Sequence, residues 1–164
     1  IGPNLRRVYH DGKDIEAREK MMLGATLAGI AFSNASVALV HGMSRPIGAF
    51  YHVPHGLSNA MLLPAVTEFS LPSAIKRYAD CSRAMGVALS EDNDEIANQK
   101  LLSELVAINE ELNVPTPREF GINETDFMNN LEVMAKQAIA SGSPGNNPRV
   151  PEVHEIIDIY KLLW

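Results

Sequence analysis

A long apolar stretch, residues 21–40, constrains the fold of this chain more than any other feature. It follows a charged beginning, in which Asp14 stands where an N-cap residue would stand and Glu16 and Glu19 fall in the early turns. Acidic side chains at these places favour the start of a helix. The stretch itself consists mainly of Met, Leu, Ala, Gly, Ile and Phe and has no clean polar face. The pattern predicts one long helix over 14–40 that is buried nearly all round.

Helical spacing continues downstream, interrupted by proline and glycine. Residues 45–54 contain Pro46, Gly48 and Pro54 and are expected to form a loop. We find no alternating strand pattern, no repeat and no low-complexity segment. The chain is therefore predicted to be all-α, an irregular helical bundle that forms a single domain over 1–164. Further helices are expected over 55–68, 73–85, 93–113, from a cap at Asn123 or Thr125 to about Ile139, and over 152–163.

Composition and charge exclude several classes of partner. The net charge is −6, and the basic residues are scattered apart from adjacent pairs such as Arg6 and Arg7, so neither nucleic acid nor a membrane surface is expected as a partner. No apolar run reaches the roughly 18 residues of a membrane span, and no signal-peptide pattern opens the chain. The single cysteine, Cys81, permits no disulfide framework and is expected to be a small core residue. These features fit a cytoplasmic protein.

The beginning of the chain is unusual. Residue 1 is Ile, and the opening residues 1–5 resemble the middle of a sequence. We therefore expect a fragment, a processed product or a trimmed sequence. The chain also has no glycine-rich turn between a strand and a helix, the feature that holds a dinucleotide pyrophosphate. A nucleotide-binding domain is accordingly expected to be absent from these 164 residues.

Three of the five histidines, His41, His52 and His55, fall within fifteen residues. His41 is expected at the end of the apolar helix and His55 at the start of the next, joined by a loop that lets their rings converge. Neutral imidazole is the commonest metal ligand in proteins, so this pair is a candidate metal site. Alternatives remain open: His41 can be a hydrogen-bonded core histidine or can cap helix carbonyls, and His55 can merely pack against the preceding turn. Two histidines do not complete a metal site.

The remaining histidines carry weaker signals. His52 lies in the expected loop, where it can face solvent or substrate. His10 and His154 have polar neighbours in the sequence and are expected at the surface.

The residues around the histidines form a longer motif. In sequence order it comprises His41, Gly42, Met43, Pro46, Gly48, Pro54, His55, Gly56, Asn59, Ala60, Leu63 and Pro64. This motif resembles the signature of the iron-containing (group III) alcohol dehydrogenases. The resemblance extends over essentially the whole chain and implies the helical C-terminal domain of the dehydroquinate synthase-like fold.

The resemblance implies a divided metal site. In that family an N-terminal α/β domain binds NAD or NADP, and one Fe(II) is held by an aspartate and three histidines. By motif position His41 and His55 match two of these ligands, and the others are expected before Ile1. The chain would then hold Fe(II), or zinc as in some relatives, only weakly.

One position departs from the family pattern. Many members carry a histidine near the nicotinamide where this sequence has Arg45. An arginine cannot relay protons near neutral pH, but it can bind a carboxylate or phosphate or orient the cofactor. A structural ion pair is an equal alternative for Arg45, and His52 is a candidate proton carrier in its place. Phe32 and Phe50 are candidate walls of the substrate or nicotinamide pocket, with ordinary core positions as the alternative.

By resemblance, the function implied is metal-assisted hydride transfer between a small alcohol or carbonyl substrate and nicotinamide, with the isolated chain inactive. Relatives with altered chemistry, such as zinc glycerol dehydrogenases or maleylacetate-type reductases, remain alternatives. So does a non-catalytic helical module in which the histidines are core residues. A role in homo-oligomerisation is a further alternative, because the Ala, Gly and Met residues of 14–40 would suit close helix packing.

Overall fold

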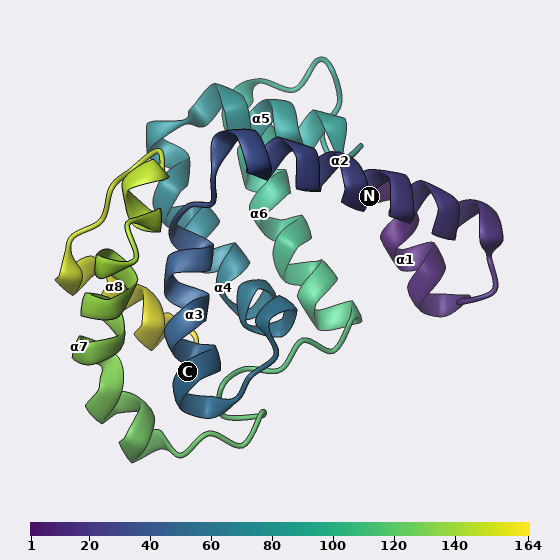
Figure 1. Ribbon diagram of the computed structural model, residues 1–164. Coiled ribbons are helices and arrows are strands. Elements are labelled where there is room, and N and C mark those ends of the chain that lie inside the picture. The colour runs from purple at the N-terminus through teal and green to yellow at the C-terminus, as the bar shows by residue number, and fades with distance from the viewer. The chain divides into compact units, whose positions relative to one another are not determined.

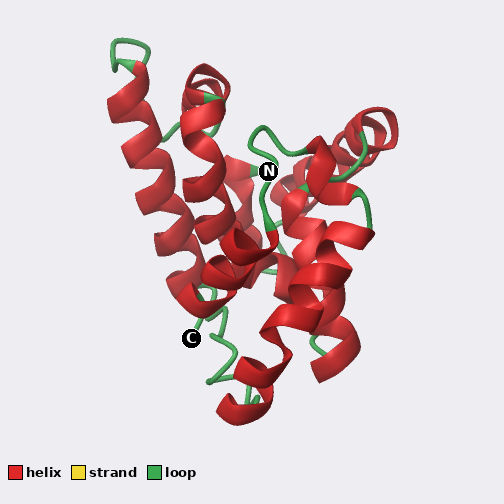
Figure 2. Cartoon of the chain, turned by 90° about the vertical axis from the view of Figure 1, so that its left-hand side faces the viewer, coloured by secondary structure: helices red, strands yellow, loops and turns green.

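All regular structure in this protein is helical (Figures 1 and 2). The computed structural model describes residues 1–164, and it contains no strand, which confirms the predicted all-α fold. The helices, in chain order, are α1 (Gly2–His10), α2 (Ile15–Ala35), α3 (Leu39–Tyr51), α4 (His55–Ser70), η1 (Leu71–Ser73), α5 (Ile75–Ala84), α6 (Asp94–Glu111), α7 (Glu124–Ala140), η2 (Ser143–Asn146) and α8 (Val153–Leu162), where η marks short 3₁₀ helices.

The chain divides into two compact units. Unit 1 comprises residues 1–36 and 75–101, and unit 2 comprises residues 37–74 and 102–164. Helix α6 runs through the boundary after residue 101, so its beginning belongs to unit 1 and its end to unit 2. The single domain expected over 1–164 stays a prediction, and each unit is described by itself.

In unit 1, helix α2 begins where the sequence predicts. The side chain of Asp14 accepts a hydrogen bond from the backbone N–H of Ala17 at 3.0 Å, as an N-cap residue does. Arg7 of α1 lies 2.7 Å from the same carboxylate and ties the two helices together. Helix α1 itself was not predicted, because its short sequence carries no apolar periodicity long enough to indicate a helix.

The prediction that this apolar helix is buried nearly all round is wrong. Ala17 is the only buried residue of α2, and Met22, Leu23 and Ile30 are 71%, 60% and 58% exposed. Within unit 1 the helix packs mainly against α1, which covers one side of it. Apolar composition therefore predicted the helix correctly, but it does not determine which neighbours cover the helix.

The predicted helix over 14–40 is also interrupted. Helix α2 ends at Ala35, Ser36 has a positive φ of 66° that a helix cannot accommodate, and α3 starts at Leu39. No glycine or proline marks this break in the sequence, so the pattern gave no sign of it.

Taken singly, no helix of the chain is long and apolar enough to span a membrane. Only α2 and α3 counted together across their break pass that test of length and composition.

The predicted loop over 45–54 is wrong as well, because α3 continues through Pro46 to Tyr51. A proline inside a helix costs about 3 kcal/mol, since it removes one hydrogen bond and crowds the preceding turn. The same helix buries Leu39, Met43 and Ile47 completely. Each such side chain contributes about 1.5–3 kcal/mol, so burial outweighs the cost of the proline.

Helix α3 is the centre of unit 2. It packs against α4, α7 and η2, and α7 and α4 in turn pack against α8. A Cβ atom at Gly42 would lie 2.9 Å from the ring of Pro144, so only glycine permits this approach of α3 to η2. The buried core is formed by apolar side chains from these helices, among them Leu39, Met43, Ile47, Leu62, Val66, Phe127, Leu131, Met134, Ile156 and Tyr160.

Several local predictions are confirmed. Helix α4 begins at His55 directly after Pro54, and the side chain of Asn123 caps α7 by accepting from the N–H of Asp126 at 3.1 Å. His10 and His154 are exposed, as expected.

The prediction that Cys81 is a core residue is wrong, because it lies on an exposed face of α5. Its neighbours Ala79 and Ser82 occupy the buried face instead.

The hydroxyl of Tyr160 provides a test of this core. It donates a hydrogen bond of 2.7 Å to the carbonyl oxygen of Met43, and burial raises the pKa of Tyr160 far above its ordinary value. Tyr160→Phe removes the bond while keeping the ring. We expect it to lower the free energy of unfolding by about 1 kcal/mol in urea denaturation.

Tyr9→Phe serves as the matched control. The Tyr9 side chain is 49% exposed, so water can replace any partner of its hydroxyl, and the expected change is close to zero. Equal effects of the two substitutions would contradict a specific role for the bond between Tyr160 and Met43.

Candidate functional site

The two histidines of the motif lie at the beginnings of neighbouring helices in unit 2. His55 is the first residue of α4, as expected. His41 is the third residue of α3 and so lies in its first turn, not at the end of an apolar helix as predicted. The break after Ala35 explains the difference, because it makes the segment around His41 the start of a new helix. The alternative in which His41 caps the carbonyls at a helix end is thereby wrong.

A tight reversal connects these helices. His52 ends α3 in the left-handed conformation with a φ of 55°, and its N–H donates to the carbonyl of Gly48 at 3.0 Å. A Cβ atom at Gly48 would lie 3.3 Å from the carbonyl oxygen of Val53, so glycine leaves room for the returning chain. Only residues 52–54 separate the helices, which contact one another along their length.

The reversal brings the rings of His41 and His55 together. Their centroids are 5.2 Å apart and their planes are inclined by 55°. Two nitrogens that bind one metal ion at about 2.0–2.1 Å lie at most about 4 Å from each other. Two imidazoles with this centroid separation can satisfy that limit, so the pair fits two ligands of one ion. His41 is half-buried and His55 is exposed, which leaves the pair accessible from outside unit 2.

The surroundings keep His41 uncharged. Burial lowers the pKa of His41, and the neighbouring His55 and the guanidinium of Arg45 lower it further. A neutral imidazole offers a lone pair, which is the form that binds a metal. No group of three or more His, Cys, Asp or Glu side chains gathers here or elsewhere in the chain. These residues therefore supply two imidazole donors and no carboxylate.

Two polar side chains contact the ring of His55. The hydroxyl of Ser44 lies 3.4 Å from Nδ1, and the amide nitrogen of Asn59 lies 3.3 Å from Nδ1 and 3.2 Å from Nε2. Asn59 belongs to the sequence motif, but its contact with the ring was not predicted. Ser44 was missed entirely, because it is eleven residues from His55 and no sequence pattern links the two.

The other predicted site residues are not brought into contact with this pair. Arg45 is exposed on α3 and acts on His41 through its charge, without a carboxylate within ion-pair distance. The role of Arg45, towards substrate, towards cofactor or in an ion pair, stays a prediction. His52 is exposed at the end of α3. Phe32 lies on α2 in unit 1 and is 56% exposed, and Phe50 is 38% exposed, so neither is an ordinary core aromatic.

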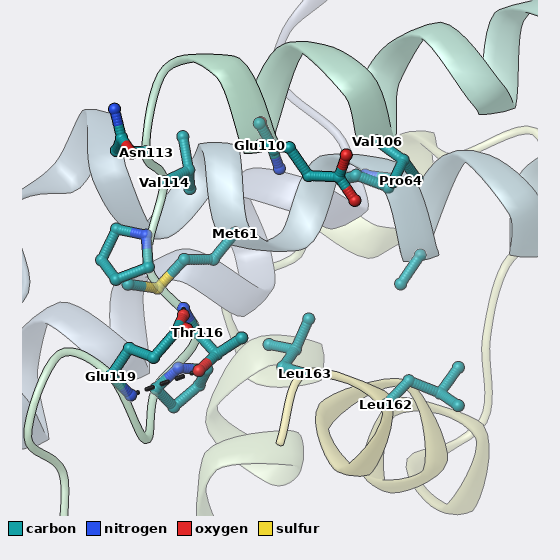
Figure 3. Close-up of a pocket in the computed structure, with 14 residues that line it drawn as sticks. Met61, Pro64, Val106, Glu110, Asn113, Val114, Thr116, Glu119, Leu162 and Leu163 are labelled. Carbon is teal, nitrogen blue, oxygen red and sulfur yellow. Dashed lines mark hydrogen bonds between the residues drawn. The ribbon is translucent and has the colours of Figure 1, made fainter.

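A separate open groove of about 740 Å³ lies elsewhere in unit 2 (Figure 3). Met61 and Pro64 of α4, Val106 of α6 and Leu162 and Leu163 at the end of the chain contribute to its walls. A reciprocal pair of hydrogen bonds between Thr116 and Glu119 fixes the loop on another side. None of the predicted site residues lines this groove, so the groove and the histidine pair are different places.

The motif and its geometry agree with a comparison to known families. The whole chain, residues 1–164, matches the family model described as the C-terminal part of the Fe-containing alcohol dehydrogenase family. This chain belongs to the iron-containing alcohol dehydrogenase family. The family resemblance inferred from the histidine motif is confirmed.

Individual relatives agree with the assignment. A lactaldehyde reductase of Escherichia coli (strain K12) is 35% identical over 152 residues, which cover 92% of this chain and 39% of the relative. An NADPH-dependent butanol dehydrogenase of Clostridium saccharobutylicum is 34% identical, over 100% of this chain and 42% of the relative. A crystal structure of a 1,3-propanediol oxidoreductase superposes with a TM-score of 0.90 at 32% identity, over 99% of this chain and 42% of that chain. The chain thus spans about two fifths of the length of these relatives.

The electrostatic contact within the site can be tested by removing one charge. Arg45→Met keeps most of the side-chain length and deletes the guanidinium. Because Arg45 lowers the pKa of His41, we expect this substitution to raise that pKa in a proton NMR titration. Burial remains as the larger cause, so the pKa should stay below the ordinary value. Added salt should shrink the difference, because it screens charges near the surface.

Arg149→Met is the matched control. Arg149 pairs with Glu155 and lies over the ring of Phe69, and it has no influence on His41. If both substitutions leave the pKa of His41 unchanged, the proposed effect of Arg45 is wrong.

Proposed function

We propose that this chain is the metal-binding C-terminal part of an NAD(P)-dependent alcohol dehydrogenase that interconverts small alcohols and carbonyl compounds. The observation that carries the proposal is the pair of imidazoles of His41 and His55, whose centroids are 5.2 Å apart. The resemblance of the motif to the family signature assigns these two positions to metal ligands. The relatives are a lactaldehyde reductase, a butanol dehydrogenase and 1,3-propanediol dehydrogenases, which supports a small alcohol or aldehyde as the substrate class.

In this proposal His41 and His55 are ligands of a divalent ion, Fe(II) or zinc. Both rings belong to the first turn of a helix that is fixed by the core of unit 2, so their positions are set before an ion binds. The lowered pKa of His41 keeps its lone pair available near neutral pH. Such an ion, when bound, acts as a Lewis acid that lowers the pKa of an alcohol and so favours loss of hydride to nicotinamide.

Arg45 and His52 are the side chains proposed to act on substrate or cofactor. The guanidinium of Arg45 is exposed, carries no carboxylate partner and influences His41, so it can hold an anionic group close to the metal ligands. His52 is the exposed imidazole nearest to them along the chain and is assigned the role of proton carrier. Phe32 is proposed as a wall for nicotinamide, as an exposed aromatic ring suits that role.

A second candidate function follows from Arg45. An unpaired guanidinium near the metal ligands favours a substrate that carries a carboxylate, as in maleylacetate-type reductases. Alternatively, the guanidinium of Arg45 binds a phosphate of NADPH. The lone exposed cysteine fits the cytoplasmic setting that this proposal includes, because it requires no oxidising compartment.

The test is made in the full-length enzyme of which this chain is proposed to be a part. It compares His41→Ala and His55→Ala with the unmodified enzyme, loaded with Fe(II) without oxygen. We expect both substitutions to reduce bound metal and NAD(P)-linked alcohol oxidation by more than about 100-fold. Loss of even a hydrogen-bond partner of a metal ligand costs about 10–100-fold. Metal content is measured by mass spectrometry, and circular dichroism verifies that the helices persist.

His154→Ala is the matched control, because His154 is 71% exposed and lies in α8, outside the motif. It should leave metal content and activity unchanged. Full metal content and activity in the His41 and His55 variants would contradict the proposal. Comparing a neutral diol with an oxo acid then separates the two candidate functions, since only an acidic substrate should require Arg45.

A further inference from the structure

A histidine that binds a metal through one ring nitrogen needs its second nitrogen held by a hydrogen bond. That bond selects which nitrogen carries the hydrogen and therefore which one offers a lone pair. In His55 the second contact is made by Ser44, whose hydroxyl lies 3.4 Å from Nδ1. Ser44 is only 1% exposed, so water cannot easily take its place.

The direction of this bond follows from the other partner of Ser44. Its hydroxyl donates to the carbonyl oxygen of His41 at 3.4 Å, and a carbonyl can only accept. A hydroxyl has one hydrogen and two lone pairs, so the hydrogen of Ser44 is engaged and a lone pair faces His55. In this arrangement Nδ1 of His55 carries a hydrogen, which it donates to the hydroxyl oxygen of Ser44. The result is a chain from the His55 ring through Ser44 to the backbone of His41.

The contact of Asn59 does not compete for the ring nitrogens. Its amide nitrogen donates to the carbonyl oxygen of His55 at 2.7 Å, which fixes the orientation of the amide. The same nitrogen lies almost equally far, 3.3 and 3.2 Å, from Nδ1 and Nε2. A group in the ring plane could not approach both nitrogens equally without overlapping the carbon between them. Asn59 therefore lies over the face of the ring and leaves the lone pair in its plane free.

We propose that Ser44 is a positioning residue that holds His55 as the Nδ1–H tautomer and so makes Nε2 the ligand atom. Through the same hydroxyl, Ser44 couples the ring of His55 to the backbone of His41, the other ligand. The inference rests on the proposed function for the role of Nε2 as a metal ligand. The tautomer itself is a property of the metal-free chain and can be measured independently.

The experiment measures the tautomer of His55 by two-dimensional NMR of the ¹⁵N-labelled, metal-free chain, at a pH where the ring is neutral. In the unmodified chain we expect Nδ1 to carry the hydrogen. Ser44→Ala deletes the acceptor at a buried helix position that alanine suits well, and the hydrogen should move toward Nε2. Ser58→Ala is the matched control. Ser58 is also fully buried, but its hydroxyl donates to the backbone carbonyl of His55 at 3.0 Å and not to the ring.

A zinc titration of the same three chains follows. Ser44→Ala should weaken zinc binding by about 10–100-fold, while Ser58→Ala should not. An Nε2–H tautomer in the unmodified chain, or the same tautomer with and without Ser44, would overturn the proposal. An equal affinity for zinc in all three chains would also overturn it. If the tautomer shifts as expected but the unmodified chain does not bind zinc, the assignment of Ser44 stands and the metal role of His55 fails.

Discussion

The burial of one face of α3 is the interaction on which the rest of unit 2 depends. Leu39, Met43 and Ile47 are completely buried on that face, and Tyr160 of α8 donates a hydrogen bond to the backbone of Met43. Burial of each of these three side chains contributes about 2 kcal/mol to stability. Their sum exceeds the cost of about 3 kcal/mol for Pro46 inside the same helix. The helix therefore stays continuous from Leu39 to Tyr51, and the chain can reverse only after its end.

The position of the histidine pair follows from this constraint. His41 lies in the first turn of α3, and His55 begins α4 after a link of three residues. Because the core holds both helices, the two rings face each other without help from an ion. The buried hydroxyl of Ser44 lies between the two elements and contacts both. The proposed metal ligands, and the side chain proposed to orient one of them, thus all depend on the packing of α3.

Part of this arrangement could be predicted from the sequence. The caps at Asp14 and Asn123 and the start of α4 at His55 were correct, because each depends on local chemistry that a few neighbouring residues determine. The family followed from the motif around His41 and His55. Each of these features is determined by residues that lie within one short segment of the sequence.

The errors concern features that depend on distant residues. Pro46 lies inside a helix because of burial against other helices, and Ser36 breaks a helix without any local signal. The exposure of α2 depends on which neighbours unit 1 provides, and composition does not specify them. The contact of Ser44 with His55 joins two helices across a reversal that was expected to begin before Pro46. The contact between Ser44 and His55 exists only in the folded arrangement of the two helices, which no local sequence pattern specifies.

The central claim is that His41 and His55 act together on one ion. It is tested most directly by following the ring nitrogens of all five histidines by ¹⁵N NMR while zinc is added to the chain. The account predicts that one nitrogen of His41 and Nε2 of His55 shift together, with a single midpoint and one ion per chain. Different midpoints for the two rings, or earlier shifts at His10, His52 or His154, would contradict it.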